Sequence, residues 1–212
     1  MMLLGLIWAV LAPLSLAFLV LLLAWLMRKT GLPRAYLLAT LLVLTPVAAL
    51  WYADRSAFMR VCEGEAKPVV YRHAKADSLF LNSGTANSFG MRNLQEEGFS
   101  WIEAPSIYQR NAWVRYTRGE SGTITTTEIP AITARYEVQE DFSQPHDHTG
   151  LTQIKIIDRN NGELIAQAGS ATFSGGSAKW VLGAWGTKSC PSAMSSPEQF
   201  NDFYHLAKKA LR

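Results

Sequence analysis

Two long apolar segments without charged side chains open the chain, and a short basic loop separates them. Residues 1–27 and 35–53 contain no Asp, Glu, Lys or Arg, whereas residues 28–34 contain three cations with a glycine and a proline. A helix rises about 1.5 Å per residue and must cross roughly 30 Å of hydrocarbon, so about 20 apolar residues span a bilayer. The pattern predicts a transmembrane hairpin over residues 1–53, with helices at about 3–27 and 35–53.

The same loop predicts the orientation of the hairpin. It carries Arg28, Lys29 and Arg34 and no acid, and short positive loops stay in the cytoplasm. The N-terminus and residues 54–212 then lie on the opposite face, which is the periplasm in a bacterium. We expect a two-pass protein of the bacterial inner membrane. A cleaved signal peptide is the alternative, but the first segment lacks a positive start and its apolar run is longer than a signal needs.

Alternation of apolar and polar residues predicts that residues 54–212 form one β-rich domain. Apolar positions at 132, 134, 136 and 138 alternate with polar ones, which is the period of a half-buried strand. Two further apolar runs flank Asn161-Gly162, a pair that favours a tight hairpin turn, and predict a hairpin over residues 151–173. Other strands are expected at residues 69–74, 99–103, 112–117, 122–127 and 179–182, and a loop at residues 83–88.

One amphipathic helix is predicted to end the chain. Ser196 suits its cap, Pro197 its first turn, and Gln199 the third position of a capping box. An apolar stripe follows at helical spacing and is expected to pack on the sheet; it consists of Phe200, Phe203, Tyr204, Ala207 and Leu211. The predicted fold class is therefore α+β: a transmembrane hairpin, then a β-rich, mainly antiparallel domain closed by one C-terminal helix.

The distribution of charge argues against nucleic-acid binding. The chain has 20 Lys and Arg and 17 Asp and Glu, for a net charge of +3. All three loop cations precede the first acid, so residues 54–212 hold 17 basic and 17 acidic residues and are neutral. A neutral domain without a cluster of cations lacks the electrostatic footprint of a phosphate binder.

The two cysteines are predicted to form a disulfide. Cys62 lies shortly after the membrane segment and Cys190 shortly before the C-terminal helix. An oxidising periplasm allows them to pair, and the bridge would tie the end of the domain to its start. Two buried free thiols are the alternative interpretation. The pair is not a C-x-x-C motif, and two cysteines are too few for a cysteine zinc site.

A short segment rich in histidine is the candidate metal site. His146, Asp147 and His148 supply ligand types that suit zinc or copper. Pro145 and Gly150 bracket them, however, so a polar loop between two strands is the alternative interpretation. The sequence identifies no third protein ligand and predicts no other cofactor.

Motifs of hydrolases and nucleotide-binding enzymes are missing. The chain has no G-x-S-x-G, no H-E-x-x-H, no P-loop and no G-x-G-x-x-G sequence. Acidic residues that could pair as glycosidase carboxylates occur, but acids on a strand-rich surface are usually solvated; they are Glu96, Glu97, Glu103, Glu140 and Asp141.

Aromatic residues give the candidate contact with a protein partner. In residues 112–117, Trp113 and Arg115 share the face of the predicted strand that carries charge. An exposed tryptophan beside an arginine is typical of an interface anchor. Aromatic residues buried in a β core are the alternative interpretation.

Two classes of function fit these observations. The first is a membrane-anchored interaction protein whose periplasmic domain binds another protein: an immunity protein against an envelope-targeting toxin, or an accessory subunit of a secretion, pilus or transport assembly. The second is an envelope enzyme that acts on lipid or peptidoglycan through a site without a known motif. The absence of catalytic motifs and the neutral charge favour the first.

Overall fold

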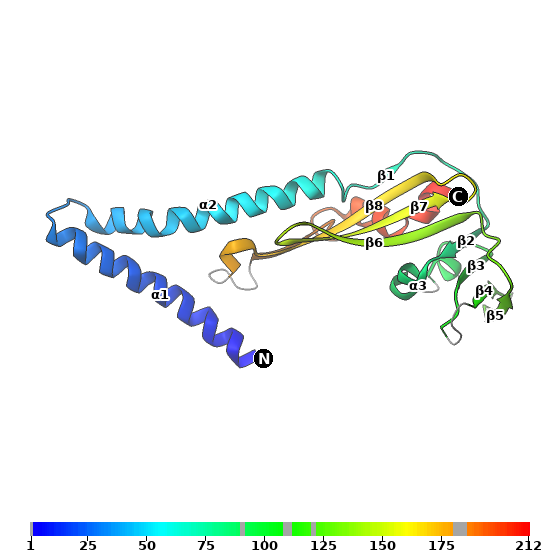
Figure 1. Ribbon diagram of the computed structural model, residues 1–212, viewed down its shortest axis with the longest axis horizontal. Coiled ribbons are helices and arrows are strands. Elements are labelled where there is room, and N and C mark those ends of the chain that lie inside the picture. The colour runs from blue at the N-terminus through cyan, green and yellow to red at the C-terminus, as the bar shows by residue number, and fades with distance from the viewer. Residues whose placement is uncertain (1, 90–91, 108–111, 120–121, 180–185) are drawn as a thin grey trace. The chain divides into compact units, whose positions relative to one another are not determined.

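A computed structural model describes residues 2–89, 92–107, 112–119, 122–179 and 186–212. The described chain is α+β with a mixed sheet, and its N-terminal part is helical (Figure 1). Contacts divide it into two compact units. The first unit contains Met1–Val61, Gln144–Gly150 and Thr172–Ser189, and the second contains Cys62–Ser143, Leu151–Ala171 and Cys190–Arg212.

Helix α1 (Met2–Lys29) ends two residues before Gly31, the glycine of the basic loop. Gly31 has a φ of 76°, its N–H donates to the Arg28 carbonyl at 3.1 Å, and Leu32 donates to Met27 at 3.2 Å. This pair of bonds is the Schellman motif, which satisfies carbonyls that the last helical turn leaves without partners. The loop therefore stops α1 by a defined backbone geometry.

Helix α2 (Ala35–Glu63) runs through Pro46 and well beyond the apolar segment. Among the described residues it is the one helix long and apolar enough to cross a membrane, judged by length and composition. The interpretation of α1 as a second membrane helix stays a prediction. The chain after Ala53 remains helical to Glu63, so the residues that follow the apolar segment extend α2 toward Cys62.

The sheet is mixed, so the expectation of a mainly antiparallel sheet is too simple. The described strands follow the order β1-β8-β7-β6-β2-β3-β4-β5, and β9 also pairs with β8. Their bounds are β1 Val69–Val70, β2 Ser78–Leu81, β3 Trp101–Pro105, β4 Trp113–Arg118, β5 Ile124–Ile129, β6 Tyr136–His146, β7 Thr149–Asp158, β8 Glu163–Ser174 and β9 Thr187–Cys190.

Strand β2 causes the difference, because it lies parallel to both β3 and β6. Parallel strands need a crossover connection rather than a tight turn. Helices α3 (Ser83–Phe89) and α4 (Arg92–Gln95) supply it between β2 and β3, where the sequence predicted a loop. The Asn82 carboxamide accepts from the Thr85 N–H at 2.9 Å and caps α3.

The hairpin predicted over residues 151–173 is confirmed as β7 and β8, joined by a turn at residues 159–162. The alternating pattern at residues 132–139 is confirmed only from Tyr136 onward, where β6 begins. The preceding residues are not a strand, because the N–H groups of Thr133 and Ala134 donate to the Glu103 carboxylate instead of a neighbouring strand. Of the strand predicted at residues 179–182, residues 180–182 lie outside the described chain.

The C-terminal helix is interrupted, so the prediction of one helix is wrong. Helix α6 (Pro197–Tyr204) and helix α7 (Leu206–Leu211) meet at His205, whose backbone is not helical. Arg92 donates to the Tyr204 carbonyl at the break. Ser196 stands at the cap position of α6 but its side chain makes no capping bond.

The core of the second unit lies between its part of the sheet and these helices. Its members come from β2, β3, β6, β7 and β8, from Leu94 of α4 and nearby Phe99, and from α6 and α7. In the predicted C-terminal stripe, Phe203, Ala207 and Leu211 are buried. The apolar face of the C-terminal segment therefore packs on the sheet, as its spacing predicts.

Candidate functional site

The first unit gathers an acid, two histidines and a serine, here called the Asp54 cluster: Asp54, His146, His148 and Ser177. Asp54 lies on α2 and is 8% exposed. His146 ends β6, and His148 lies in the two-residue turn between β6 and β7. Ser177 lies in the 3-10 turn η1 (Gly176–Ala178), which follows β8.

Two glycines bring Ser177 to the acid. Gly175 and Gly176 have φ values of 95° and 65°, a conformation that side chains disfavour. A Cβ added at Gly176 would lie 2.6 Å from Asp54 Oδ2, so the backbone approaches the carboxylate too closely for any side chain. The Ser177 N–H then donates to Asp54 Oδ2 at 2.6 Å.

The geometry of the Asp54 cluster differs from that of a serine hydrolase. Ser177 Oγ lies 3.3 Å from His148 Nε2, a distance at which the imidazole can accept the hydroxyl proton. In a hydrolytic triad, however, the acid holds the histidine and the histidine holds the serine. Here Asp54 accepts from the backbone N–H of the serine. The cluster therefore holds η1 against α2 more directly than it activates a nucleophile.

Apolar packing supports this connecting role. The rings of Phe58 on α2 and Phe173 on β8 stack with centroids 5.4 Å apart. The Ser174 N–H donates to the His148 carbonyl at 3.1 Å, which joins the end of β8 to the β6–β7 turn. Within the first unit, α2, the hairpin tip and η1 thus share one set of contacts.

The predicted metal ligands do not form one group. His148 faces Ser177, whereas Asp147 is exposed. His146 Nδ1 is buried and has no hydrogen-bond partner in the described part of the chain. Across those residues, no three His, Cys, Asp or Glu side chains lie close enough together to hold a metal ion. Metal binding at His146, Asp147 and His148 stays a prediction without a structural argument in its favour.

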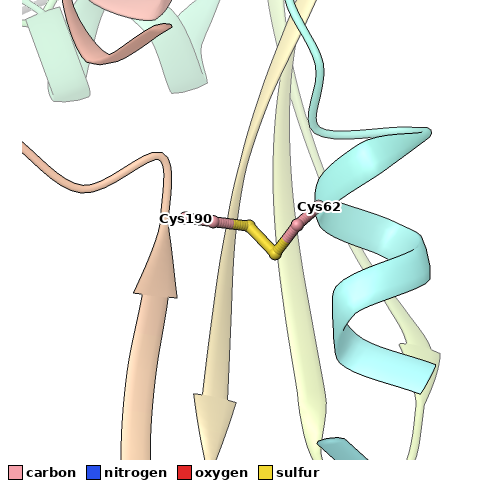
Figure 2. Close-up of a disulfide and its surroundings, with 2 residues drawn as sticks. All are labelled: Cys62 and Cys190. Atoms are coloured by element: carbon pink, nitrogen blue, oxygen red, sulfur yellow. A yellow bond between two sulfur atoms is a disulfide. The ribbon is translucent and has the colours of Figure 1, made fainter. Parts of the chain in front are cut away.

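The structure joins the two cysteines (Figure 2). Cys62 lies in the last turn of α2 and Cys190 ends β9, with their Cα atoms 5.9 Å apart and a sequence separation of 128 residues. Both belong to the second unit. The bridge links the end of β9, shortly before the C-terminal helices, to the last turn of α2.

The two predicted partner contacts make internal contacts in the second unit. Trp113 and Arg115 are half-buried. The Trp113 ring meets Phe80 edge-on with centroids 5.7 Å apart. The Arg115 guanidinium lies 4.2 Å from the centre of the Trp101 ring and donates to Glu103 at 2.7 Å. Their role in binding a partner stays a prediction.

Two acids that the sequence suggested were solvated are buried. Glu103 is 0% exposed and accepts from Arg115, from Thr133 and from the N–H groups of Thr133 and Ala134. Burial alone raises its pKa, but these hydrogen bonds outweigh burial and hold the pKa below the ordinary value. Glu103 thus orders the segment before β6. Its alternation with neighbouring apolar residues in the sequence did not indicate this role.

Glu97 is the second buried acid and lies at the break between α6 and α7. Its carboxylate is 3.2 Å from His205 Nδ1 and 3.6 Å from Arg92. Burial raises the pKa of Glu97, against the opposing influence of Arg92 and His205. This contact holds the interrupted C-terminal segment to the end of α4.

Sequence reasoning missed Asp54 and Ser177 as a pair. One signal was present: Asp54 is the first acid after the apolar segment, on a helix that continues through it. No protein-family model, curated protein or solved structure matches this chain.

Proposed function

We propose that this chain is a two-pass protein of the bacterial inner membrane whose domain after α2 lies in the periplasm and binds another protein. The observation that supports the periplasmic location most strongly is the Cys62–Cys190 disulfide. Stable disulfides form in oxidising compartments such as the periplasm and are rare in the cytosol.

The basic loop supports the same topology independently. Arg28, Lys29 and Arg34 stand between two apolar helical segments, and α2 leads without a break from its apolar part to Cys62. A cytoplasmic loop and a periplasmic disulfide lie on opposite faces, which is where one crossing of α2 would place them. The second crossing, by α1, follows from its length and its lack of charged residues before Arg28.

Binding is favoured over chemistry because the buried acids that the structure describes in the second unit are engaged internally. Glu103, Asp158 and Glu97 each accept from or pair with a cation of the same unit. The domain has no net charge, and the serine of the Asp54 cluster is held by the acid rather than activated through the histidine. A compact tethered domain of this kind suits an immunity protein or an accessory subunit of an envelope assembly.

Isolation of the full-length protein tests the proposal. The tagged chain is extracted from native membranes in mild detergent after chemical cross-linking in cells, and the proteins that accompany it are identified and quantified by mass spectrometry. An untagged strain serves as the control for proteins that adhere to detergent. One partner in stoichiometric amount supports the proposal. A cross-linked preparation that contains no such partner contradicts it.

A second candidate is an envelope hydrolase that acts on lipid or peptidoglycan, and the 3.3 Å approach of Ser177 to His148 favours it. A fluorophosphonate probe labels activated serines. Labelling that disappears in Ser177→Ala and persists in the neighbouring control Ser174→Ala supports catalysis. Absence of labelling in the folded wild-type protein eliminates it.

A further inference from the structure

The strands at the two ends of the sheet differ in how well they are protected against pairing with another chain. One end is β1, a strand of two residues, and the other is β5, which pairs with β4 through six consecutive residues without a bulge. Proteins usually protect an edge with short strands, lysines, prolines or bulges. Within Ile124–Ile129, strand β5 has no lysine, proline or bulge, and its one charged residue is Glu128 near the end of the strand. Over the described chain, it is the long edge with little such protection.

Strand β5 is also exposed on both faces. Residues 125–128 are all exposed although successive side chains point to opposite faces. Its central residues are Thr125, Thr126 and Thr127, which have high β propensity and no charge. A strand of this composition contributes little to the core of its own chain and presents a regular backbone edge for pairing.

The sequence of β5 suits pairing with itself. In an antiparallel pair, two facing residues either both hydrogen-bond to the other strand or both do not. When a strand pairs with its own copy about a two-fold axis, the axis must therefore pass beside one residue, which faces the same residue of the second copy. Centring on Thr126 sets Thr125 opposite Thr127 of the second copy. Threonine pairs across strands are favourable. On this face the hydroxyls of Thr117 and Thr125 already lie 3.0 Å apart, so the pairing would lengthen an existing row.

The neighbouring register is less favourable. Centring on Thr127 sets Ile124 opposite Pro130, which has no N–H to donate. It also places the two Glu128 side chains at diagonal positions, about 7–8 Å apart. The Thr126 register keeps these carboxylates four residues apart and ends before Pro130.

We propose that β5 is a dimerisation edge, at which β5 of one copy pairs antiparallel with β5 of a second copy about a two-fold axis through Thr126. A single pair of strands buries little surface, but confinement to a membrane raises the effective concentration of the second copy. This goes beyond the proposed function, because it names one partner as the chain itself.

Cysteine cross-linking of the full-length protein in its native membranes tests the proposal. Thr126→Cys places two thiols opposite each other at the axis, and mild oxidation is expected to convert most of the protein to a covalent dimer. Ser143→Cys, at an exposed position on β6, is the matched control and is expected to stay monomeric. Equal cross-linking of both variants, or none in either, overturns the proposal.

Charge exchange tests the register. Thr127→Lys sets a lysine opposite Thr125 of the second copy and is expected to weaken dimerisation at least tenfold, because the edge gains a cation. Adding Thr125→Glu to the same chain sets glutamate opposite lysine twice and is expected to restore the dimer. Failure of the double variant to recover association overturns the Thr126 register.

The measurement is the monomer–dimer equilibrium in lipid vesicles, by energy transfer between labelled copies at several ratios of protein to lipid. An intact native disulfide in each variant, shown by thiol counting, verifies that the domain is folded. A wild-type chain that is monomeric at all ratios contradicts the inference without touching the membrane topology. If the chain is monomeric and its β5 variants lose a different protein that copurifies with the wild type, the β5 edge binds that protein and the inference is wrong.

Discussion

Removal of the Cys62–Cys190 bridge is expected to destabilise the domain strongly. The bridge closes a segment with a sequence separation of 128 residues, for which chain-entropy theory gives a stabilisation of roughly 5 kcal/mol at 25 °C. Whole domains are stable by only about 5–15 kcal/mol. The double variant Cys62→Ser with Cys190→Ser should therefore lose between about a third and all of the wild-type stability.

The assay is urea unfolding of the full-length protein in detergent, followed by tryptophan fluorescence. With a urea dependence of about 2 kcal/mol per molar, a loss of roughly 5 kcal/mol lowers the midpoint by about 2–3 M. Reduced wild-type protein is the matched control and should unfold at the same midpoint as the double variant. A difference below about 1 kcal/mol between oxidised and reduced protein would refute the reasoning, because the entropy of a long loop would then not be the source of stability.

Three further predictions concern buried groups of the second unit. Glu103→Gln should lower the stability by roughly 3 kcal/mol, because it breaks a buried ion pair, and urea unfolding near the wild-type midpoint contradicts this. The hydrogen bond from Arg135 holds the pKa of Asp158 below its ordinary value, so its stabilisation is present above that value and is lost as the pH falls through the lowered pKa. Thermal unfolding between pH 7 and pH 3 should therefore show a smaller loss for Asp158→Asn than for wild type, and parallel curves argue against it. Gly169→Ala should destabilise by about 1–3 kcal/mol through overpacking, since an added Cβ lies 2.7 Å from the nearest backbone atom, whereas the control Gly84→Ala has 3.5 Å and should be nearly neutral.

The elements that the sequence predicted well are those with a repeating local pattern. The β7–β8 hairpin follows from two apolar runs around Asn161-Gly162, and the buried stripe at Phe203, Ala207 and Leu211 follows from helical spacing. Both patterns depend on neighbours in sequence. Periodicity therefore sufficed to find them.

The elements that it predicted poorly depend on distant contacts. The residues before β6 alternate like a strand, yet Glu103 takes their N–H groups. The C-terminal stripe continues through His205, yet Arg92 and Glu97 meet the chain there and the helix is interrupted. The parallel placement of β2 likewise follows from two short helices whose residues give a weak local signal.

The candidate site shows the same limit. His146 and His148 were identifiable because they are close together in sequence, whereas Asp54 and Ser177 meet across a separation of 123 residues. Only the fold reveals that the histidine-rich turn faces a serine and a buried acid. The role of the hairpin tip as a contact with α2 was therefore not predictable from its composition.

The membrane topology is the central claim, and thiol labelling in intact spheroplasts tests it most directly. Phe142→Cys, at a position 75% exposed on β6, and Thr30→Cys, in the basic loop, each add one thiol to a chain whose native cysteines are paired. A membrane-impermeant maleimide is predicted to label Phe142→Cys in intact spheroplasts and Thr30→Cys only after lysis. Labelling of Thr30→Cys from outside, with Phe142→Cys protected until lysis, would contradict the account.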